Sequence, residues 1–135
     1  MKTKIKLVVL ALMAVYCIMP NSTLKSEAGS ATKTIAVHAN IWTVHGIYTK
    51  SVSNKYVYAK NYAGYGEYAY CYGQARSDLS GVWSTYTSNY KLSKGGGFVT
   101  MTLSNTIDSG KNVSLRLIGA DSQTGDDNNR VVFQY

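Results

Sequence analysis

Apolar and polar side chains alternate in two runs of the stretch FVTMTLSNTIDSGKNVSLRLI, residues 98–118. The first run is Val99–Leu103 and the second is Val113–Leu117. A period of two places the apolar side chains of each run on one face of a β-strand. The residues between the runs include Asp108–Lys111, whose serine and glycine are typical of a turn. The stretch therefore predicts two amphipathic strands separated by a turn.

The same alternation occurs elsewhere after residue 33, in Thr34–Ala39 and Val131–Tyr135. Turn-forming clusters separate the alternating runs, among them Gly95–Gly97 and Asp121–Asn129. No segment after residue 28 shows a sustained helical period. These features predict an all-β fold, a small antiparallel β-sandwich of about seven or eight strands that forms one domain over residues 29–135.

The N-terminus has the order of features found in a secretory signal peptide. Three lysines in the first six residues precede the apolar run Leu7–Met19, and a polar segment follows. We predict a signal peptide over residues 1–28 with cleavage after Ala28, or alternatively after Ala31. The run is shorter than the roughly 20 apolar residues that span a bilayer, so a membrane anchor is disfavoured. We therefore expect a secreted protein without stable membrane insertion after cleavage.

Cleavage would also change the charge of the protein. Ten of the 14 basic residues and six of the seven acidic residues lie after residue 28, so the net charge falls from +7 to +4. A mild positive charge suits a polyanionic surface, whereas the absence of a Lys/Arg cluster argues against a nucleic-acid partner. Cys71 is the one cysteine after residue 28, so no intramolecular disulfide can form. A secreted protein without disulfides points to a Gram-positive bacterium.

Tyrosine is concentrated in one short window. Seven of the 12 tyrosines lie between residues 56 and 72, and several are two residues apart. Two strands joined by the loop Ala63–Tyr65 would bring these rings together as cross-strand pairs of a β-hairpin. The predicted pairs are Tyr56 with Tyr72, Tyr58 with Tyr70, and Lys60 with Tyr68.

The two faces of this predicted hairpin differ in polarity. One face carries Val57, Ala59, Ala69 and Cys71, and we expect it to face the core because a free cysteine is usually buried. We expect the phenol face to point outward, since an unsatisfied buried hydroxyl costs about 1–3 kcal/mol. Alternatively, some rings lie across a sandwich edge with only their hydroxyls in water. The predicted ligand-binding residues are Tyr56, Tyr58, Lys60, Tyr68, Tyr70 and Tyr72.

The sequence predicts no catalytic set, no metal site and no cofactor. His38 and His45 supply too few ligands for a zinc site and are expected at the surface or an edge. A glycosidase needs two suitably placed carboxylates, and Glu67 with Asp78 is a pair left open. The loop Asp121–Asn129 is either a solvated turn or a calcium site, because it is rich in oxygen ligands.

Two segments carry a resemblance to a known family. They are His45-Gly46-Ile47-Tyr48, which a Ser/Asn/Tyr-rich segment follows, and ARSDLSGVW, residues 75–83. Together with the lysine-rich leader, the scarcity of cysteine and the aromatic chain end, they resemble the lactococcin-type β-sandwich bacteriocins of Gram-positive bacteria. The chain differs from the short bacteriocins in the region Gly95–Tyr135 and in Cys71. The resemblance implies a small secreted β-sandwich that binds a cell-wall precursor, and it assigns no residue a role.

These features together predict a secreted, non-enzymatic protein that binds at the bacterial cell envelope, to a cell-wall component, a glycan or a surface protein. Trp42 and Trp83 are expected in the core, although a tryptophan beside the tyrosines would suit a sugar- or partner-binding surface. One alternative is a self-associating structural or matrix protein, because tyrosine-rich strands can stack edge to edge. Another is a small secreted hydrolase or its inhibitor.

Overall fold

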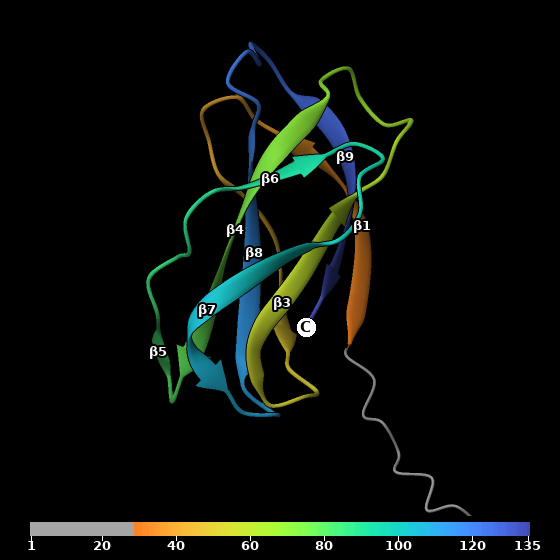
Figure 1. The fold of residues 1–135 in the computed structure, drawn as a ribbon. Helices are drawn as coiled ribbons and strands as arrows, with labels where there is room; N and C mark the ends of the chain where they lie inside the picture. Colours follow the sequence, from red (N-terminus) through yellow and green to blue (C-terminus); the bar gives the residue numbers. More distant parts are fainter. Residues whose placement is uncertain (1–28) are drawn as a thin grey trace, which may run out of the picture.

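The computed structural model describes residues 29–135, and its regular elements are all β-strands (Figure 1). The predicted all-β fold is confirmed, with nine strands instead of seven or eight. Two of the nine, β5 and β6, are two and four residues long, too short for alternation to reveal them. The strands are β1 (Ser30–Val37), β2 (Thr43–Thr49), β3 (Asn54–Asn61), β4 (Tyr70–Leu79), β5 (Val82–Trp83), β6 (Tyr90–Ser93), β7 (Val99–Ile107), β8 (Asn112–Gly119) and β9 (Asp127–Gln134).

The predicted signal peptide, residues 1–28, lies outside the described residues. Within residues 29–135, no helix has the length and apolarity needed to cross a bilayer.

Two antiparallel sheets pack face to face as a sandwich. The first sheet has the order β1-β9-β3-β7, and the second has the order β2-β8-β4-β5 with β6 beside β4. In Figure 1, β7 crosses in front of β4 and β8. Alternating apolar side chains of the long strands β3, β4, β7 and β8 point between the sheets, as the sequence pattern predicts. The fully buried members of the core include Val37, Val57, Cys71, Met101, Ile107, Leu115, Leu117 and Phe133.

The predicted hairpin between β3 and β4 is wrong. Tyr58 of β3 lies opposite Thr100 of β7 and Gln134 of β9, within the first sheet. In the second sheet, Tyr72 of β4 lies opposite Ile118 of β8. Residues 62–69 therefore cross from one sheet to the other, and the two sets of tyrosines belong to different sheets.

A buried carboxylate from a distant part of the chain fixes this crossing. Asp127 Oδ1 accepts a hydrogen bond from the backbone N–H of Glu67 at 2.6 Å, and Oδ2 accepts one from that of Tyr68 at 3.3 Å. Lys94 Nζ also donates to Oδ2 at 2.8 Å. Burial opposes the charge on Asp127, but these three donors outweigh it and lower the pKa of the carboxyl group. Two backbone N–H groups of the crossing segment thus donate to Asp127 and not to the facing strand of a hairpin.

The predicted facing of these strands is confirmed for most of the residues. Val57, Ala59 and Cys71 are fully buried in the core. Ala69 is exposed instead of buried, because it precedes the first residue of β4. Tyr56 is exposed, and the remaining predicted tyrosines are half-buried. The rings therefore lie on outer surfaces of the sandwich, but not on a single one.

His45 lies on the edge strand β2, as one of the two predicted locations allowed, but its side chain is buried and not at the surface. A bulge in β2 between Val44 and Gly46 breaks the alternation and directs this ring inward. Its Nε2 donates to the carbonyl oxygen of Val131 at 2.9 Å, and Tyr48 Oη donates to Nδ1 at 2.9 Å. Both bonds suit a neutral imidazole. Desolvation lowers the pKa of His45, against the opposing effect of the bond to Val131.

The buried His45 should make stability depend on pH near neutrality. The unfolded chain takes up a proton near pH 6.5, whereas the folded protein, with its lowered pKa, does not. The free energy of unfolding should therefore decrease as the pH falls below about 6.5. Urea unfolding of the wild type and His45→Gln at pH 7.5 and pH 5.0 tests this, with His38→Gln as a control. The wild type and His38→Gln should lose more stability on acidification than His45→Gln, and an equal loss in all three would contradict the assignment.

Candidate functional site

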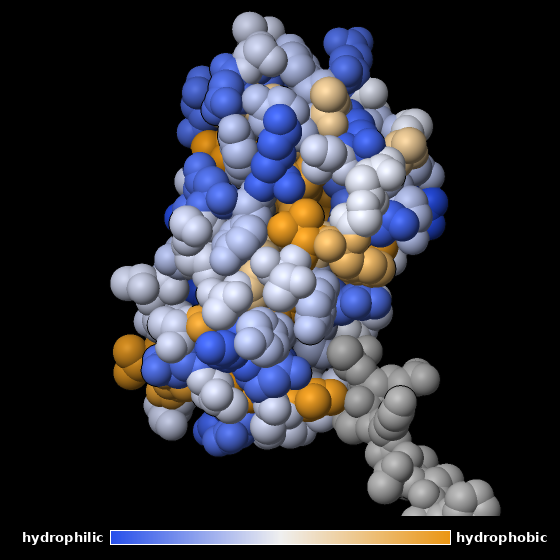
Figure 2. Space-filling view, in the orientation of Figure 1, coloured by the Kyte–Doolittle hydropathy of each residue, from blue (hydrophilic) through white to orange (hydrophobic). Residues whose placement is uncertain are grey.

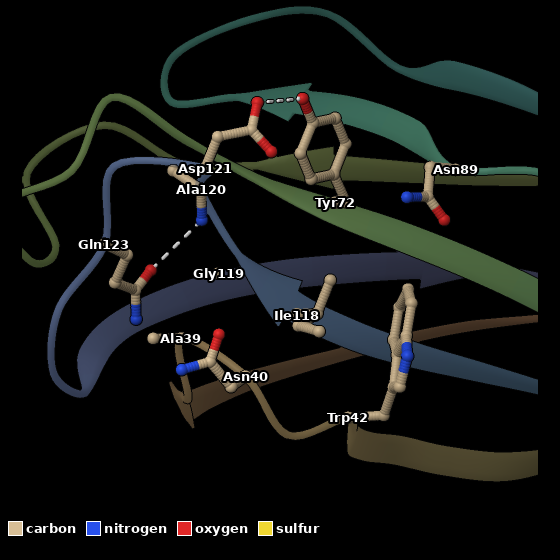
Figure 3. Close-up of a pocket in the computed structure, with 10 residues that line it drawn as sticks. All are labelled: Ala39, Asn40, Trp42, Tyr72, Asn89, Ile118, Gly119, Ala120, Asp121 and Gln123. Atoms are coloured by element: carbon tan, nitrogen blue, oxygen red, sulfur yellow. Dashed lines mark hydrogen bonds between the residues drawn. The ribbon is translucent and has the colours of Figure 1, made fainter.

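A pocket of about 290 Å³ opens on the outer face of the second sheet (Figure 3). Tyr72 of β4 and Ile118 of β8 lie side by side on this face because they are opposite each other in the strand ladder. Trp42 comes from the segment before β2. Figure 3 shows the three side chains projecting from neighbouring elements around one space, which we call the Trp42 pocket. Its large apolar groups are therefore two aromatic rings and one branched aliphatic side chain, and Ala39 and Ala120 complete the apolar lining.

Polar groups line the rest of the Trp42 pocket. Asn40, Asn89 and Asp121 contribute two amides and a carboxylate. Planar groups of this kind can each form two hydrogen bonds with neighbouring polar atoms of a ligand. Gln123 has a structural role instead, since its Nε2 donates to the carbonyl oxygen of Val37 at 2.6 Å. The pocket combines flat apolar surfaces with hydrogen-bonding groups at its rim.

A pair of tyrosines is bound to the carboxylate of this pocket. Tyr72 Oη donates to Asp121 Oδ2 at 2.9 Å, and Tyr70 Oη donates to the same oxygen at 3.2 Å. The hydrogen bond to Asp121 raises the pKa of Tyr72 to about 12. The two rings meet edge to face with centroids 5.4 Å apart, and Lys91 Nζ lies 4.0 Å from the Tyr70 centroid. These contacts hold the Tyr72 ring in position at the pocket.

Trp42 is also one end of a row of alternating rings and guanidinium groups, which we call the tryptophan ladder. The Arg116 guanidinium carbon lies 4.3 Å from the Trp42 ring centroid and 3.5 Å from that of Tyr86. Arg76 lies 4.6 Å from both the Tyr86 and the Trp83 centroids. Cation–π contacts of this kind contribute about 0.5–2 kcal/mol each. The ladder therefore restrains both tryptophans on the outer face of the second sheet.

Hydrogen bonds connect the ladder to the pocket wall. The Arg116 Nε and Nη2 atoms donate to Gln74 Oε1 at 3.0 and 2.6 Å, and Gln74 Nε2 donates to Asn89 Oδ1 at 2.6 Å. Both tryptophans are half-buried on the outer face, not in the core as predicted. Neither arginine was among the predicted site residues. Arg76 could have been found from the sequence, because the alternation of β4 places it on the same face as Tyr70, Tyr72 and Gln74.

The six predicted ligand-binding residues are divided between surfaces. Tyr70 and Tyr72 lie at or beside the Trp42 pocket. Tyr56, Tyr58 and Lys60 belong to β3 in the first sheet. Tyr68 lies in the crossing segment, where its hydroxyl accepts a hydrogen bond from the backbone N–H of Thr124 at 3.2 Å. The structure thus places two of the six near the pocket.

Two side chains with nucleophilic groups, Cys71 and Lys50, are buried in the interior. Burial raises the pKa of the Cys71 thiol to about 12, and Asn61 Nδ2 lies 3.6 Å from its sulfur. Lys50 is 2 % exposed, and its Nζ donates to Asn54 Oδ1 at 2.6 Å and to the carbonyl oxygen of Tyr56 at 2.9 Å. Desolvation lowers the pKa of Lys50. Both groups serve packing and the β2–β3 turn.

The carboxylates singled out in the sequence do not converge. Glu67 precedes the start of β4 and Asp78 is near its end, so a strand of about 30 Å separates them. In the loop Asp121–Asn129, Asp126 pairs with His38, whereas Asp121 and Asp127 bind the groups described above. Among residues 29–135, no group of three histidine, cysteine or acidic side chains is placed to hold a metal ion.

Comparison of the chain with protein-family models, with curated proteins and with solved structures gives no match.

Proposed function

We propose that this protein is a secreted, non-enzymatic binding protein of the bacterial cell envelope, and that its Trp42 pocket holds a sugar unit of a cell-wall component. The predicted signal peptide supports secretion, and the low cysteine content supports a Gram-positive source. The observation that carries the proposal is the pocket itself, with its two restrained rings and planar polar groups.

The lining of the pocket matches the chemistry of a pyranose. One face of such a sugar presents C–H groups, which pack against flat aromatic rings such as Trp42 and Tyr72. Its ring substituents are neighbouring hydroxyls, which suit the amides of Asn40 and Asn89 and the carboxylate of Asp121. Because the rings are already restrained, little side-chain entropy would be lost on binding.

Removal of the Trp42 ring should abolish most of this binding. Trp42→Ala should weaken cosedimentation with insoluble Gram-positive cell-wall fragments by about tenfold or more, the effect of truncating a central aromatic contact. The matched control is Trp83→Ala, which removes a ring from the other end of the same ladder, outside the pocket. This control should bind within about twofold of the wild type.

Two further measurements complete the test. In Trp83→Phe, Trp42 is the sole tryptophan, so its fluorescence should respond to soluble wall fragments. Equal binding by Trp42→Ala and Trp83→Ala would remove the pocket from the proposal. Absence of wild-type binding to whole cells, wall fragments and glycans would contradict the function as a whole. Growth inhibition of Gram-positive strains by the wild type, lost in Trp42→Ala, would specify a bacteriocin-like role.

Self-association as a structural protein is the second candidate, favoured by one exposed apolar area. Ile41, Val44 and Ile47 are 66 %, 55 % and 58 % exposed, and the last two belong to β2, an edge strand of the second sheet. Edge strands are the common site of sheet extension between copies. Sedimentation velocity over a wide concentration range distinguishes the candidates, because a persistent monomer excludes the structural one.

A further inference from the structure

The outer face of the first sheet carries a second row of alternating rings and cations. Lys60 Nζ lies 5.9 Å from the Phe98 ring centroid and 5.1 Å from that of Tyr62. Arg130 continues the row, with its guanidinium carbon 5.4 Å from the Tyr62 centroid and 5.5 Å from that of Tyr65. We call this row the lysine ladder. It lies on the opposite side of the sandwich from the Trp42 pocket.

Strand pairing explains why these residues share a face. Lys60 of β3 is opposite Val132 of β9, and the backbone N–H of Tyr62 donates to the carbonyl oxygen of Arg130 at 2.9 Å. Residues two apart on paired strands point to the same side of a sheet. Tyr62 is 38 % exposed and Phe98 is 45 % exposed. The ladder is therefore an open surface, and Figure 2 shows small apolar areas among hydrophilic side chains on the face that it views.

Among residues 29–135, the cations of the lysine ladder form no ion pair with an acidic residue. The two ion pairs within residues 29–135 involve His38 and Lys94, so neither Lys60 nor Arg130 takes part in one. The strands of the first sheet contain a single acidic residue, Asp127, which is buried and bound to Lys94. Within the part of the chain that the structure describes, the Arg130 guanidinium donates one hydrogen bond, from Nη1 to Tyr65 Oη at 2.8 Å. Its remaining N–H groups are available to an anion.

We propose that the lysine ladder binds a linear polyol-phosphate polymer of the cell wall, with Lys60 and Arg130 contacting successive phosphodiesters. Charge complementarity carries this assignment, because the strands of this sheet present Lys60 and Arg130 without an exposed carboxylate and the polymer presents a regular row of anions. The Arg130 guanidinium suits two phosphate oxygens at once. The rings beside each cation restrain the long side chains and would pack against the carbon backbone of the polyol.

An open face suits a chain, whereas the Trp42 pocket suits a single sugar unit. The ladder and the pocket would therefore bind two kinds of wall component on opposite sides of one domain. The ladder proposal shares with the proposed function only the location at the cell wall. Each site can fail independently of the other.

The experiment measures binding of the purified protein to a soluble polyglycerol-phosphate polymer by fluorescence anisotropy. The double variant Lys60→Gln/Arg130→Gln should bind at least about tenfold more weakly than the wild type, and its affinity should depend less steeply on salt between about 50 and 200 mM. The matched control is Lys55→Gln/Lys111→Gln, which removes the same charge from exposed positions outside the ladder and the pocket. This control and Trp42→Ala should bind the polymer within about threefold of the wild type.

The possible outcomes are distinct. Equal weakening by the two double variants would overturn the proposal, because net charge alone would then explain binding. Equally strong binding of the wild type to single-stranded DNA or to vesicles of anionic phospholipid would overturn the assignment to a wall polymer. Polymer binding that persists in Trp42→Ala would support the ladder proposal. If the wild type at the same time binds no sugar in its pocket, the proposed function is contradicted while the ladder proposal stands.

Discussion

The Asp127→Ala variant is expected to lose about 3–5 kcal/mol of unfolding free energy, because it leaves a buried charge without its partner. Asp127 is 4 % exposed, and the side chain of Lys94 is 10 % exposed. Without the carboxylate, Lys94 keeps its charge in a site with little water, and the backbone N–H groups of Glu67 and Tyr68 lose their acceptor. Urea unfolding followed by tryptophan fluorescence measures the loss.

The neighbouring Asp126 provides the matched control. Its side chain is 62 % exposed and pairs with His38, so Asp126→Ala should cost no more than about 1 kcal/mol. A double-mutant cycle with Lys94→Met tests the cause, because removing both buried charges should cost less than the sum of the single changes. Similar stability of the two alanine variants would show that the buried pair does not hold the crossing segment.

The Phe133→Ala variant should lose a similar amount, about 3–5 kcal/mol, because of the cavity that it leaves in the core. Phe133 is fully buried, and its ring centroid is 5.7 Å from that of Tyr48 and 5.8 Å from that of Tyr135. Those two tyrosines stack on each other at 4.7 Å, and His45 is bound to the Val131 backbone. The surrounding rings are therefore held in place and cannot close the space.

Thermal and urea unfolding of Phe133→Ala and Phe133→Leu would test this expectation. The leucine variant retains most of the apolar volume and should lose less than about 1.5 kcal/mol. A loss below about 1 kcal/mol in Phe133→Ala would mean that the aromatic cluster relaxes into the cavity.

Side-chain alternation predicts which face of a strand is buried, but it does not predict which strand lies beside it. The facing of Val57, Ala59 and Cys71 follows directly from the pattern and is confirmed. The pairing of β3 with β4 is wrong because Asp127, far along the chain, takes the hydrogen bonds of residues 67 and 68. Gly64 and Gly66 have positive φ angles of 83° and 68°, as a tight loop would need. Local turn chemistry therefore does not distinguish a hairpin from a crossing between sheets.

The candidate site was less predictable than the fold for the same reason. The outward facing of Tyr70 and Tyr72 could be read from alternation, but the Trp42 pocket joins four segments that are separated in the sequence. The position of Trp42 beside Ile118 depends on the pairing of β2 with β8. The tryptophan ladder likewise needs Arg76 and Arg116 on paired strands. A single sequence contains no signal for such pairings beyond the alternation of each strand.

The pairing of β1 with β9 has a consequence for how the chain folds. These strands pair along their whole length, from Ser30 with Gln134 to Val37 with Asp127. Contacts between residues so far apart form slowly, because chain entropy is lost before the pairing contributes any stability. The first sheet cannot close until the last strand has been synthesised. A chain that emerges from its N-terminus would therefore stay incompletely folded until its last strand, Asp127–Gln134, is free to pair with β1.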